Sequence, residues 1–276
     1  MFTTASPFGQ LLQVTLHLGR MIFYYIEDSI SGLNIRTAYR PDQIKGLAML
    51  AGHDASRAIS ARGAIRISYY QGGDTSLNGG VCYIPNKTKV ISKLNGMTYT
   101  ILLGAPNGKI TMQGGNFLEA TLIQGRIKMQ YVTGTGMPLQ SYNFAERNFG
   151  EVDQYYTTVY VNGEIWEQVM NIQDLGFNQK GCIVRTGING GIDIFFGNGS
   201  MGMMPQKGAK IVLEYVVTDG MGANISKEDA NSSEYWQIEG NGILPDGSEI
   251  PLDDNFKITC DTDIIFGTNA EDTALT

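Results

Sequence analysis

The sequence predicts a mainly β protein of the α+β class, with N-terminal helices followed by one or more Gly-rich antiparallel β domains of the sandwich or barrel type. Three observations predict it. Apolar residues recur at helical spacing only near the N-terminus. After residue 62 they alternate in short runs instead, and turn residues separate these runs about every 8 to 12 positions. The 35 glycines among 276 residues also suit a chain with many turns.

The first predicted helix begins at Ser6 and Pro7, because serine caps a helix N-terminus and proline fits the first turn. It ends at Ser31-Gly32 and carries one apolar face. This face can pack inside the chain or against a helix of a neighbouring subunit, and both interpretations stay open. The face consists of Leu11, Val14, Leu18, Met21, Ile22 and Tyr25.

Two further helices are predicted before the β region. One runs from Arg40-Pro41 to just before Gly52, and a short one covers Ala55 to Ala61. Their alanine content would let helices pack closely. We therefore expect residues 1–62 to form an N-terminal helical assembly region.

The remaining chain is expected to hold two regions. Strand-like runs predict a β-rich core domain over residues 63–221 and a smaller C-terminal α+β region over residues 222–276. The strongest hairpin turn is Asn162-Gly163, because both central positions of a type I′ turn require positive φ.

One Gly-rich stretch allows two interpretations. Residues 197–202 read G-N-G-S-M-G directly after an apolar run, which matches the G-x-G-x-x-G pattern of dinucleotide-binding loops. That pattern needs a helix to follow, whereas Pro205 and Gly208 disfavour a helix. Residues 209–217 are β-branched and aromatic, as in a strand. We therefore expect a strand–loop–strand corner, with nucleotide binding as the weaker alternative.

The composition narrows the range of partners. The net charge is −7, which argues against nucleic acid and against an anionic membrane surface, since proteins that bind either are usually basic. Gln13, His17 and Arg20 interrupt the apolar residues of the first helix. A membrane span needs about 20 mostly apolar residues, so we expect no membrane insertion.

Residues that carry chemistry are sparse. Three cysteines lie far apart without a C-x-x-C pair, and two histidines are too few for most metal or triad chemistry. Acidic residues between positions 253 and 272 would suit either calcium or a solvated loop. Glu164 and Glu167 flank Trp166 as in a glycosidase pair, but residues three apart on a strand face opposite sides.

We therefore expect no enzyme, and neither a catalytic residue, nor a cofactor, nor a metal, nor a small-molecule substrate. Partner binding is expected instead, through adaptable methionines, through aromatic side chains and through the first helix. The expected contact residues are Leu11, Val14, Leu18, Met21, Tyr25, Trp166, Met201, Met203 and Met204.

Five segments occur in an order that carries a family resemblance. Residues 196–208 read F-G-N-G-S-M-G-M-M-P-Q-K-G, and residues 218–224 read T-D-G-M-G-A-N. Residues 84–90 resemble an I-P-x-G-T-x-V turn, with Lys87 where Gly is usual. Residues 160–166 resemble a V-Y-V-N-G-E-x-W hairpin, and residues 267–272 resemble a G-G-x-D-x-E-D turn with Phe266 in place of the first Gly. Together these motifs resemble the baseplate J-like family of phage tail baseplate wedge proteins.

The resemblance implies a structural subunit of a bacteriophage tail baseplate. Such a subunit would form a multi-copy ring around the tail hub with itself and other baseplate or tail proteins. It would be made in the host cytoplasm, reside in the virion, and relay conformational change on host attachment. In the family a helical region follows the acidic turn, so residues 222–276 are expected to be truncated relative to it. The alternative is a carbohydrate-binding or carbohydrate-cleaving tail protein that contacts the host surface through Trp166 or Trp236.

Overall fold

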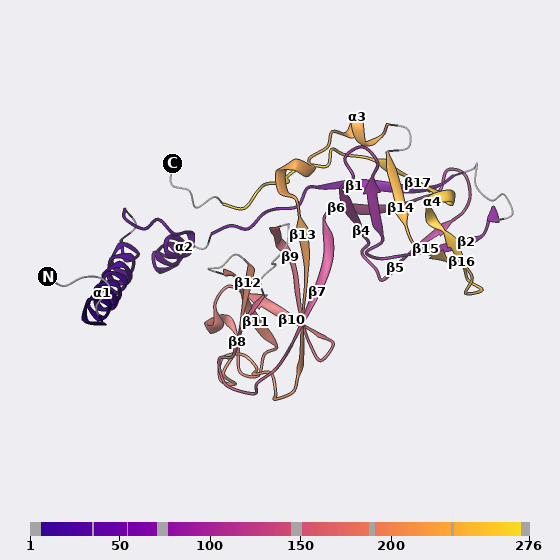
Figure 1. The fold of residues 1–276 in the computed structure, drawn as a ribbon. Coiled ribbons are helices and arrows are strands. Elements are labelled where there is room, and N and C mark those ends of the chain that lie inside the picture. Colours follow the sequence, from indigo (N-terminus) through magenta and orange to yellow (C-terminus); the bar gives the residue numbers. More distant parts are fainter. Residues whose placement is uncertain are drawn as a thin grey trace. The chain divides into compact units, whose positions relative to one another are not determined.

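The computed structural model is mainly β, with its long helices at the N-terminal end, and it confirms the predicted fold class (Figure 1). The chain divides into two compact units, a helical unit that extends to Ala55 and a β unit over Ser56–Glu271. The structure describes residues 7–34, 36–53, 55–70, 77–144, 151–187, 191–232 and 235–271.

The helical unit contains α1 (Pro7–Ser31) and α2 (Pro41–Leu50), so the first two predicted helices are confirmed. The C-terminal end of α1 is bound to the start of α2 through the carboxylate of Asp28. Tyr39 Oη donates a hydrogen bond to Asp28 Oδ1 at 2.5 Å, and Arg40 Nη1 lies 3.4 Å from Asp28 Oδ2. Along the whole of α1, Gly9 is the one residue whose surface is buried.

The third predicted helix is wrong, because residues 55–61 are not helical and instead form an isolated bridge from Ile59 to Thr268. This segment belongs to the β unit and is bound to it by hydrogen bonds. The Ser60 N–H donates to Asp153 Oδ2 at 2.7 Å, and Arg57 Nη2 donates to the carbonyl oxygen of Gln154 at 3.0 Å. These tertiary bonds outweigh the helical propensity of the alanines, so the helical region ends with α2 rather than at residue 62.

The β unit has two lobes, and the first lobe contains two sheets. A six-stranded antiparallel sheet in the order β14-β3-β4-β6-β1-β17 curls into a nearly closed barrel, and a four-stranded sheet has the order β16-β15-β2-β5. Short helical segments η3 (Gly220–Ala223), α3 (Lys227–Ala230) and α4 (Leu252–Asn255) complete the lobe. The strands are β1 (Arg62–Tyr69), β2 (Val81–Pro85), β3 (Lys89–Ser92), β4 (Thr98–Leu102), β5 (Asn107–Thr111), β6 (Phe117–Gln124), β14 (Trp236–Glu239), β15 (Asn241–Ile243), β16 (Glu249–Pro251) and β17 (Phe256–Cys260).

The second lobe is a seven-stranded sheet in the order β7-β13-β9-β10-β11-β12-β8. Its neighbouring strands are antiparallel except for β10 and β11, which are parallel and are connected through the 3₁₀ turn η2 (Ile172–Asp174). Alternate residues of its strands form a separate hydrophobic core that includes Phe196, Leu213 and Tyr215. The strands are β7 (Arg126–Thr133), β8 (Ser141–Phe144), β9 (Glu151–Val161), β10 (Glu164–Val169), β11 (Gly181–Gly187), β12 (Gly191–Phe196) and β13 (Lys210–Thr218).

The second lobe is an insertion within the first. The chain leaves the first lobe through Gly125, between β6 and β7, and returns after β13. At this crossing the buried side chain of Gln124 donates to Asp219 Oδ2 at 2.7 Å and accepts from the Thr218 hydroxyl at 2.5 Å.

This arrangement differs from the expected division between residues 221 and 222. Strands β14 and β17 pair with β3 and β1, so residues 222–271 complete the first lobe rather than form a region of their own. The last five residues of the expected C-terminal region, 272–276, lie outside the described residues.

Candidate interaction surfaces

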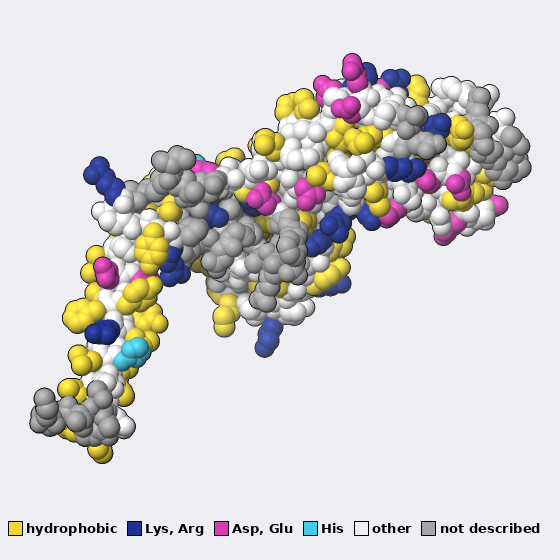
Figure 2. Space-filling model, turned by 45° about the horizontal axis from the view of Figure 1, so that its top comes forward, with side chains coloured by type: hydrophobic (Ala, Val, Ile, Leu, Met, Phe, Trp, Pro, Cys, Tyr) yellow, Lys and Arg dark blue, Asp and Glu magenta, His cyan; other side chains and the backbone are white. Residues whose placement is uncertain are grey.

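Helix α1 leaves almost all of its apolar side chains exposed. At 3.6 residues per turn these side chains cover roughly 220° of the helix circumference. Figure 2 shows hydrophobic side chains in yellow along the face of α1 that is in view. This set, called here the apolar surface of α1, consists of Phe8, Leu11, Leu12, Val14, Leu16, Leu18, Met21, Ile22, Phe23, Tyr25, Ile26 and Ile30.

The five contact residues that the sequence predicted on this helix all belong to the apolar surface of α1. Leu11 is 65% exposed, and Met21, the least exposed of the five, is 43% exposed. The remaining arc of the helix carries polar residues such as Gln13, His17 and Arg20, together with the exposed Tyr24. In the described part of the chain, no helix combines the length and apolar character that crossing a membrane requires.

The corner between β12 and β13 carries the three predicted methionines. Met201 lies at its tip and is 38% exposed. Met203 and Met204 are half-buried and line a shallow hollow of about 180 Å³, together with Trp166 and the paired side chains of Glu164 and Lys180. The hollow therefore brings together Trp166, Met203 and Met204, which are three of the four predicted contact residues of this lobe.

Trp166 is not an exposed contact residue, which corrects that expectation. Its side chain is 4% exposed and packs edge-on against Phe196 at 5.5 Å between ring centroids. The reason is the register that the turn at Asn162-Gly163 sets between β9 and β10, which places Trp166 opposite the buried Val159. The turn itself confirms the predicted hairpin, with φ of 53° and 85° at its two central residues.

The backbone of the Gly-rich corner requires glycine at three positions. Gly199 and Gly202 have φ of 94° and 72°, and a Cβ on Gly197 would meet the carbonyl oxygens of Met201 and Gly202. The corner is followed by β13, not by a helix. The predicted strand–loop–strand corner is therefore confirmed, and the helix N-terminus that a nucleotide-binding loop needs is missing here.

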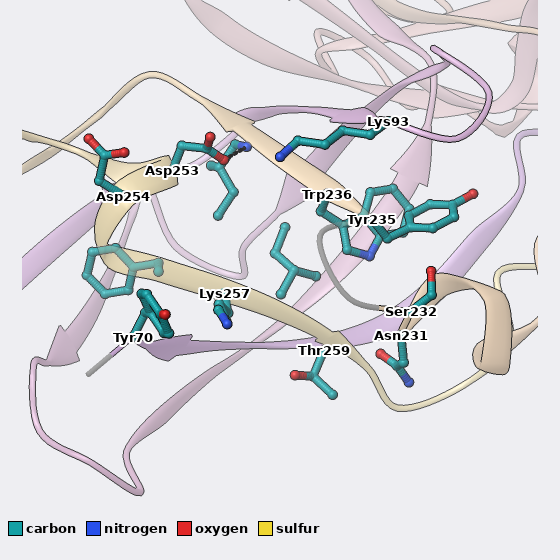
Figure 3. Close-up of a pocket in the computed structure, with 13 residues that line it drawn as sticks. Tyr70, Lys93, Asn231, Ser232, Tyr235, Trp236, Asp253, Asp254, Lys257 and Thr259 are labelled. Carbon is teal, nitrogen blue, oxygen red and sulfur yellow. Dashed lines mark hydrogen bonds between the residues drawn. The ribbon is translucent and has the colours of Figure 1, made fainter. Parts of the chain in front are cut away.

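A larger hollow of about 610 Å³ lies in the first lobe between β14 and β17 (Figure 3). Trp236 and Ile238 line it from β14, and Phe256 and Ile258 line it from β17. Sequence reasoning missed this site, because no local pattern indicates which strands end up at the edges of a sheet. The side chain of Trp236 is 9% exposed and forms part of the core of the lobe.

Acidic side chains near the C-terminal end of the described chain have separate partners. Arg66 Nε donates to Asp261 Oδ1 at 2.6 Å, while Asp263 Oδ1 accepts from the Lys227 N–H at 2.7 Å. Within the described ranges, no group of three or more His, Cys, Asp or Glu residues could hold a metal ion. Burial raises the pKa of the thiols, to about 11 for Cys82 and Cys260 and to about 12 for Cys182. Raised thiol pKa values disfavour the reactive thiolate.

The two glutamates that flank Trp166 have separate partners. Lys180 Nζ lies 2.6 Å from Glu164 Oε2, and Gln179 Nε2 donates to Glu167 Oε2 at 2.9 Å. Glu164 and Glu167 therefore do not point into a common space on one side of β10.

A scan against protein-family models and a search of curated proteins each found no match to this chain.

Proposed function

We propose that this chain is a structural wedge subunit of a bacteriophage tail baseplate and that it acts as a scaffold rather than as an enzyme. The apolar surface of α1 carries the proposal. Burial of apolar area in proteins is favourable by roughly 25 cal/mol per Å², so a helix with so much exposed apolar surface calls for partner helices. Its roughly 220° arc is wider than the narrow stripe that a single partner helix covers. Copies of this chain and other baseplate proteins would supply those partners in a ring.

The family resemblance gains support from two positions where the sequence departs from the family pattern. Lys87 and Phe266 replace glycines of that pattern, and both have left-handed backbone, with φ of 68° and 72°. Glycine is the residue that adopts this conformation most easily. The positive φ at these turns thus explains why the family pattern has glycine there. No bound ligand is needed to explain it, which agrees with a structural role.

The proposed division of labour follows the two units. The helical unit would bundle with neighbouring subunits, and the β unit would act as a firm body with its methionine corner as an adaptable docking surface. Gln124 at the crossing between the lobes is fully buried, and its side chain bonds to both Thr218 and Asp219. A body joined in this way would transmit a displacement on host attachment rather than absorb it.

Assembly tests the proposal. The chain is measured by light scattering, alone and after co-expression with the proteins encoded beside it, and its place in purified tails is sought by immunogold microscopy. Leu11→Asp/Leu18→Asp is compared with Gln10→Asp/Gln13→Asp, a matched control on the polar side of α1. We expect a complex with at least one tail protein that only the leucine variant loses. A chain that stays monomeric and joins no tail protein would contradict the proposal.

The carbohydrate alternative has less support from the structure than the scaffold function. It depended on Trp166 and Trp236 as stacking platforms, and their side chains are 4% and 9% exposed. Each ring packs against another aromatic ring inside its lobe, Trp166 on Phe196 and Trp236 on Tyr99. Although both side chains line hollows, each offers little exposed ring area on which a sugar could stack.

A further inference from the structure

The six-stranded sheet of the first lobe is open between its two edge strands. β14 and β17 stand at opposite ends of the strand order, and the hollow of about 610 Å³ lies between them. In Figure 3, Asp253 and Asp254 of α4 lie at one end of this opening, and Asn231 and Ser232 lie at the other. The opening between β14 and β17 is called here the seam.

The register of β17 determines which of its backbone groups face the seam. Asp261 N–H donates to the Ala64 carbonyl oxygen at 2.9 Å, so odd-numbered residues bond to β1 and even-numbered residues point away from it. The outward N–H and C=O of Cys260 are both bound by the side-chain amide of Asn231, at 2.7 and 2.9 Å. The outward N–H and C=O of Ile258 have no hydrogen-bond partner among the described residues.

The edge of β14 faces the seam in the same way. Lys93 N–H donates to the Tyr235 carbonyl oxygen at 2.8 Å, which directs the peptide groups of Trp236 and Ile238 toward the seam. Ile238 N–H donates to Asp253 Oδ1 at 2.8 Å, drawn as a dashed line in Figure 3. The N–H and C=O of Trp236 have no backbone partner within the described chain.

We propose that the seam binds an extended peptide segment of a partner protein, which enters as an added strand and closes the sheet. Two facing strand edges present alternating donors and acceptors, and a peptide backbone is the ligand that matches both at once. Asn231 and Asp253 already bind the ends of these edges with an amide and a carboxylate, in the places where peptide groups would lie. The proposal does not depend on the baseplate assignment.

The side chains around the seam specify the composition of the segment. On the inner side, Ile258 is only half-buried, whereas Phe256 on the same face is 2% exposed, so an apolar side chain of the segment would complete the core there. On the outer side, Lys93 and Lys257 are exposed and form no ion pair with a described residue, although Lys257 Nζ lies 3.9 Å from the ring centroid of Tyr70. We therefore infer a segment in which apolar and acidic residues alternate.

A selection experiment tests the seam. An mRNA-displayed library of random decapeptides is selected on the wild-type chain and on Ile258→Pro. Proline removes the N–H that faces the seam and leaves the bonds to β1 in place, as at natural edge strands. Gln237→Ala serves as the matched control, because its side chain points outward and its backbone bonds to β3.

The peptides that wild type enriches are then synthesised with and without N-methyl groups at their central amides. N-methylation keeps every side chain but removes the backbone donors, so it tests ladder formation even if Ile258→Pro fails to fold. We expect alternating apolar and acidic peptides that bind wild type and Gln237→Ala. We also expect at least about tenfold weaker binding after N-methylation and to Lys93→Glu/Lys257→Glu.

Three results would overturn the proposal. One is a lack of enrichment on wild type over Ile258→Pro, and another is equal affinity of the N-methylated peptides. The third is a dimer of the chain in sedimentation that Ile258→Pro abolishes, because the seam would then hold a second copy. None of these three results would contradict the baseplate proposal, because that proposal is tested with variants of α1.

Discussion

The ammonium group of Lys87 lies 2.6 Å from a carboxylate oxygen of Glu214, and this ion pair joins the two lobes of the β unit. Lys87 lies in the turn between β2 and β3, whereas Glu214 lies on β13 with a side chain that is 2% exposed. The Tyr156 hydroxyl is the second partner of the carboxylate, at 3.3 Å. A buried carboxylate is costly without partners, so this pair should contribute to the stability of the contact between the lobes alongside the bonds of Gln124.

Replacing Lys87 should therefore destabilise the fold. Lys87→Ala leaves the Glu214 carboxylate buried with one neutral partner, and we expect a loss of about 2 kcal/mol in the free energy of unfolding, measured by urea denaturation. The expected loss is below the usual range for fully buried pairs because the Lys87 side chain is 33% exposed. The control is Lys89→Ala, which removes a pair with Glu239 that is about 40% exposed on both sides and should cost less than about 1 kcal/mol.

A second substitution separates the ion pair from the backbone. Lys87 has φ of 68°, a conformation that costs L-residues about 1 kcal/mol or more and that glycine adopts freely. Lys87→Gly should thus destabilise the protein less than Lys87→Ala, although both remove the ammonium group. Equal losses would show that the turn is not strained at this position.

The glycines of the corner should differ sharply in their tolerance of alanine. A Cβ on Gly197 would meet two backbone carbonyl oxygens, whereas one on Gly199 would meet open space at a φ of 94°. We expect Gly197→Ala to cost about 3 kcal/mol or more and Gly199→Ala about 1 to 2 kcal/mol, measured by denaturant unfolding. If Gly197→Ala proved the milder change, the close backbone packing described for this corner would be incorrect.

Local features of the fold could be read from the sequence, because their determinants lie within a few residues. The apolar periodicity of α1 and the Asn162-Gly163 turn are such features, and the structure contains both. The non-helical conformation of residues 55–61 could not be read in this way, because Asp153, almost a hundred residues away, binds the segment. The same limit applies to the insertion of the second lobe.

The candidate sites also differ in whether their determinants are local in the sequence. The exposure of Leu11 and Leu18 follows from a long apolar helix that has no long partner helix among the described residues. The burial of Trp166 depends on which face of β10 meets the core, and period-2 alternation alone does not choose that face. The seam arises because β14 and β17 are the two ends of a sheet assembled from both ends of the lobe's sequence. Pairing between distant strands leaves no local signature.

The β unit should fold without the helical unit. It contains both hydrophobic cores, and α1 contributes no residue to either of them. A chain that begins at Ala51 should keep the Tm of the full-length protein within a few degrees while it loses self-association. A loss of cooperative unfolding in this shortened chain, measured by calorimetry, would show that the units depend on each other for stability.

Stability should fall steeply in alkaline solution because of the buried thiols. Burial raises the pKa of Cys182 from its ordinary value of 9.0 to about 12. Between these two values the unfolded chain has lost the thiol proton and the native chain has kept it, so unfolding releases a proton. The free energy of unfolding should thus be fully retained below pH 9 and should fall above it by about 1.4 kcal/mol per pH unit for each such thiol.

Cys182→Ala isolates the contribution of this thiol, because the variant keeps Cys82 and Cys260, whose pKa values are about 11 in the folded protein. The variant will lose some stability at every pH from the cavity it leaves. Its free energy of unfolding, measured by urea denaturation from pH 8 to 11, should nevertheless decline less steeply above pH 9 than that of wild type. Parallel curves would mean that the Cys182 thiol titrates in the folded protein as it does in the unfolded chain, and that water reaches it.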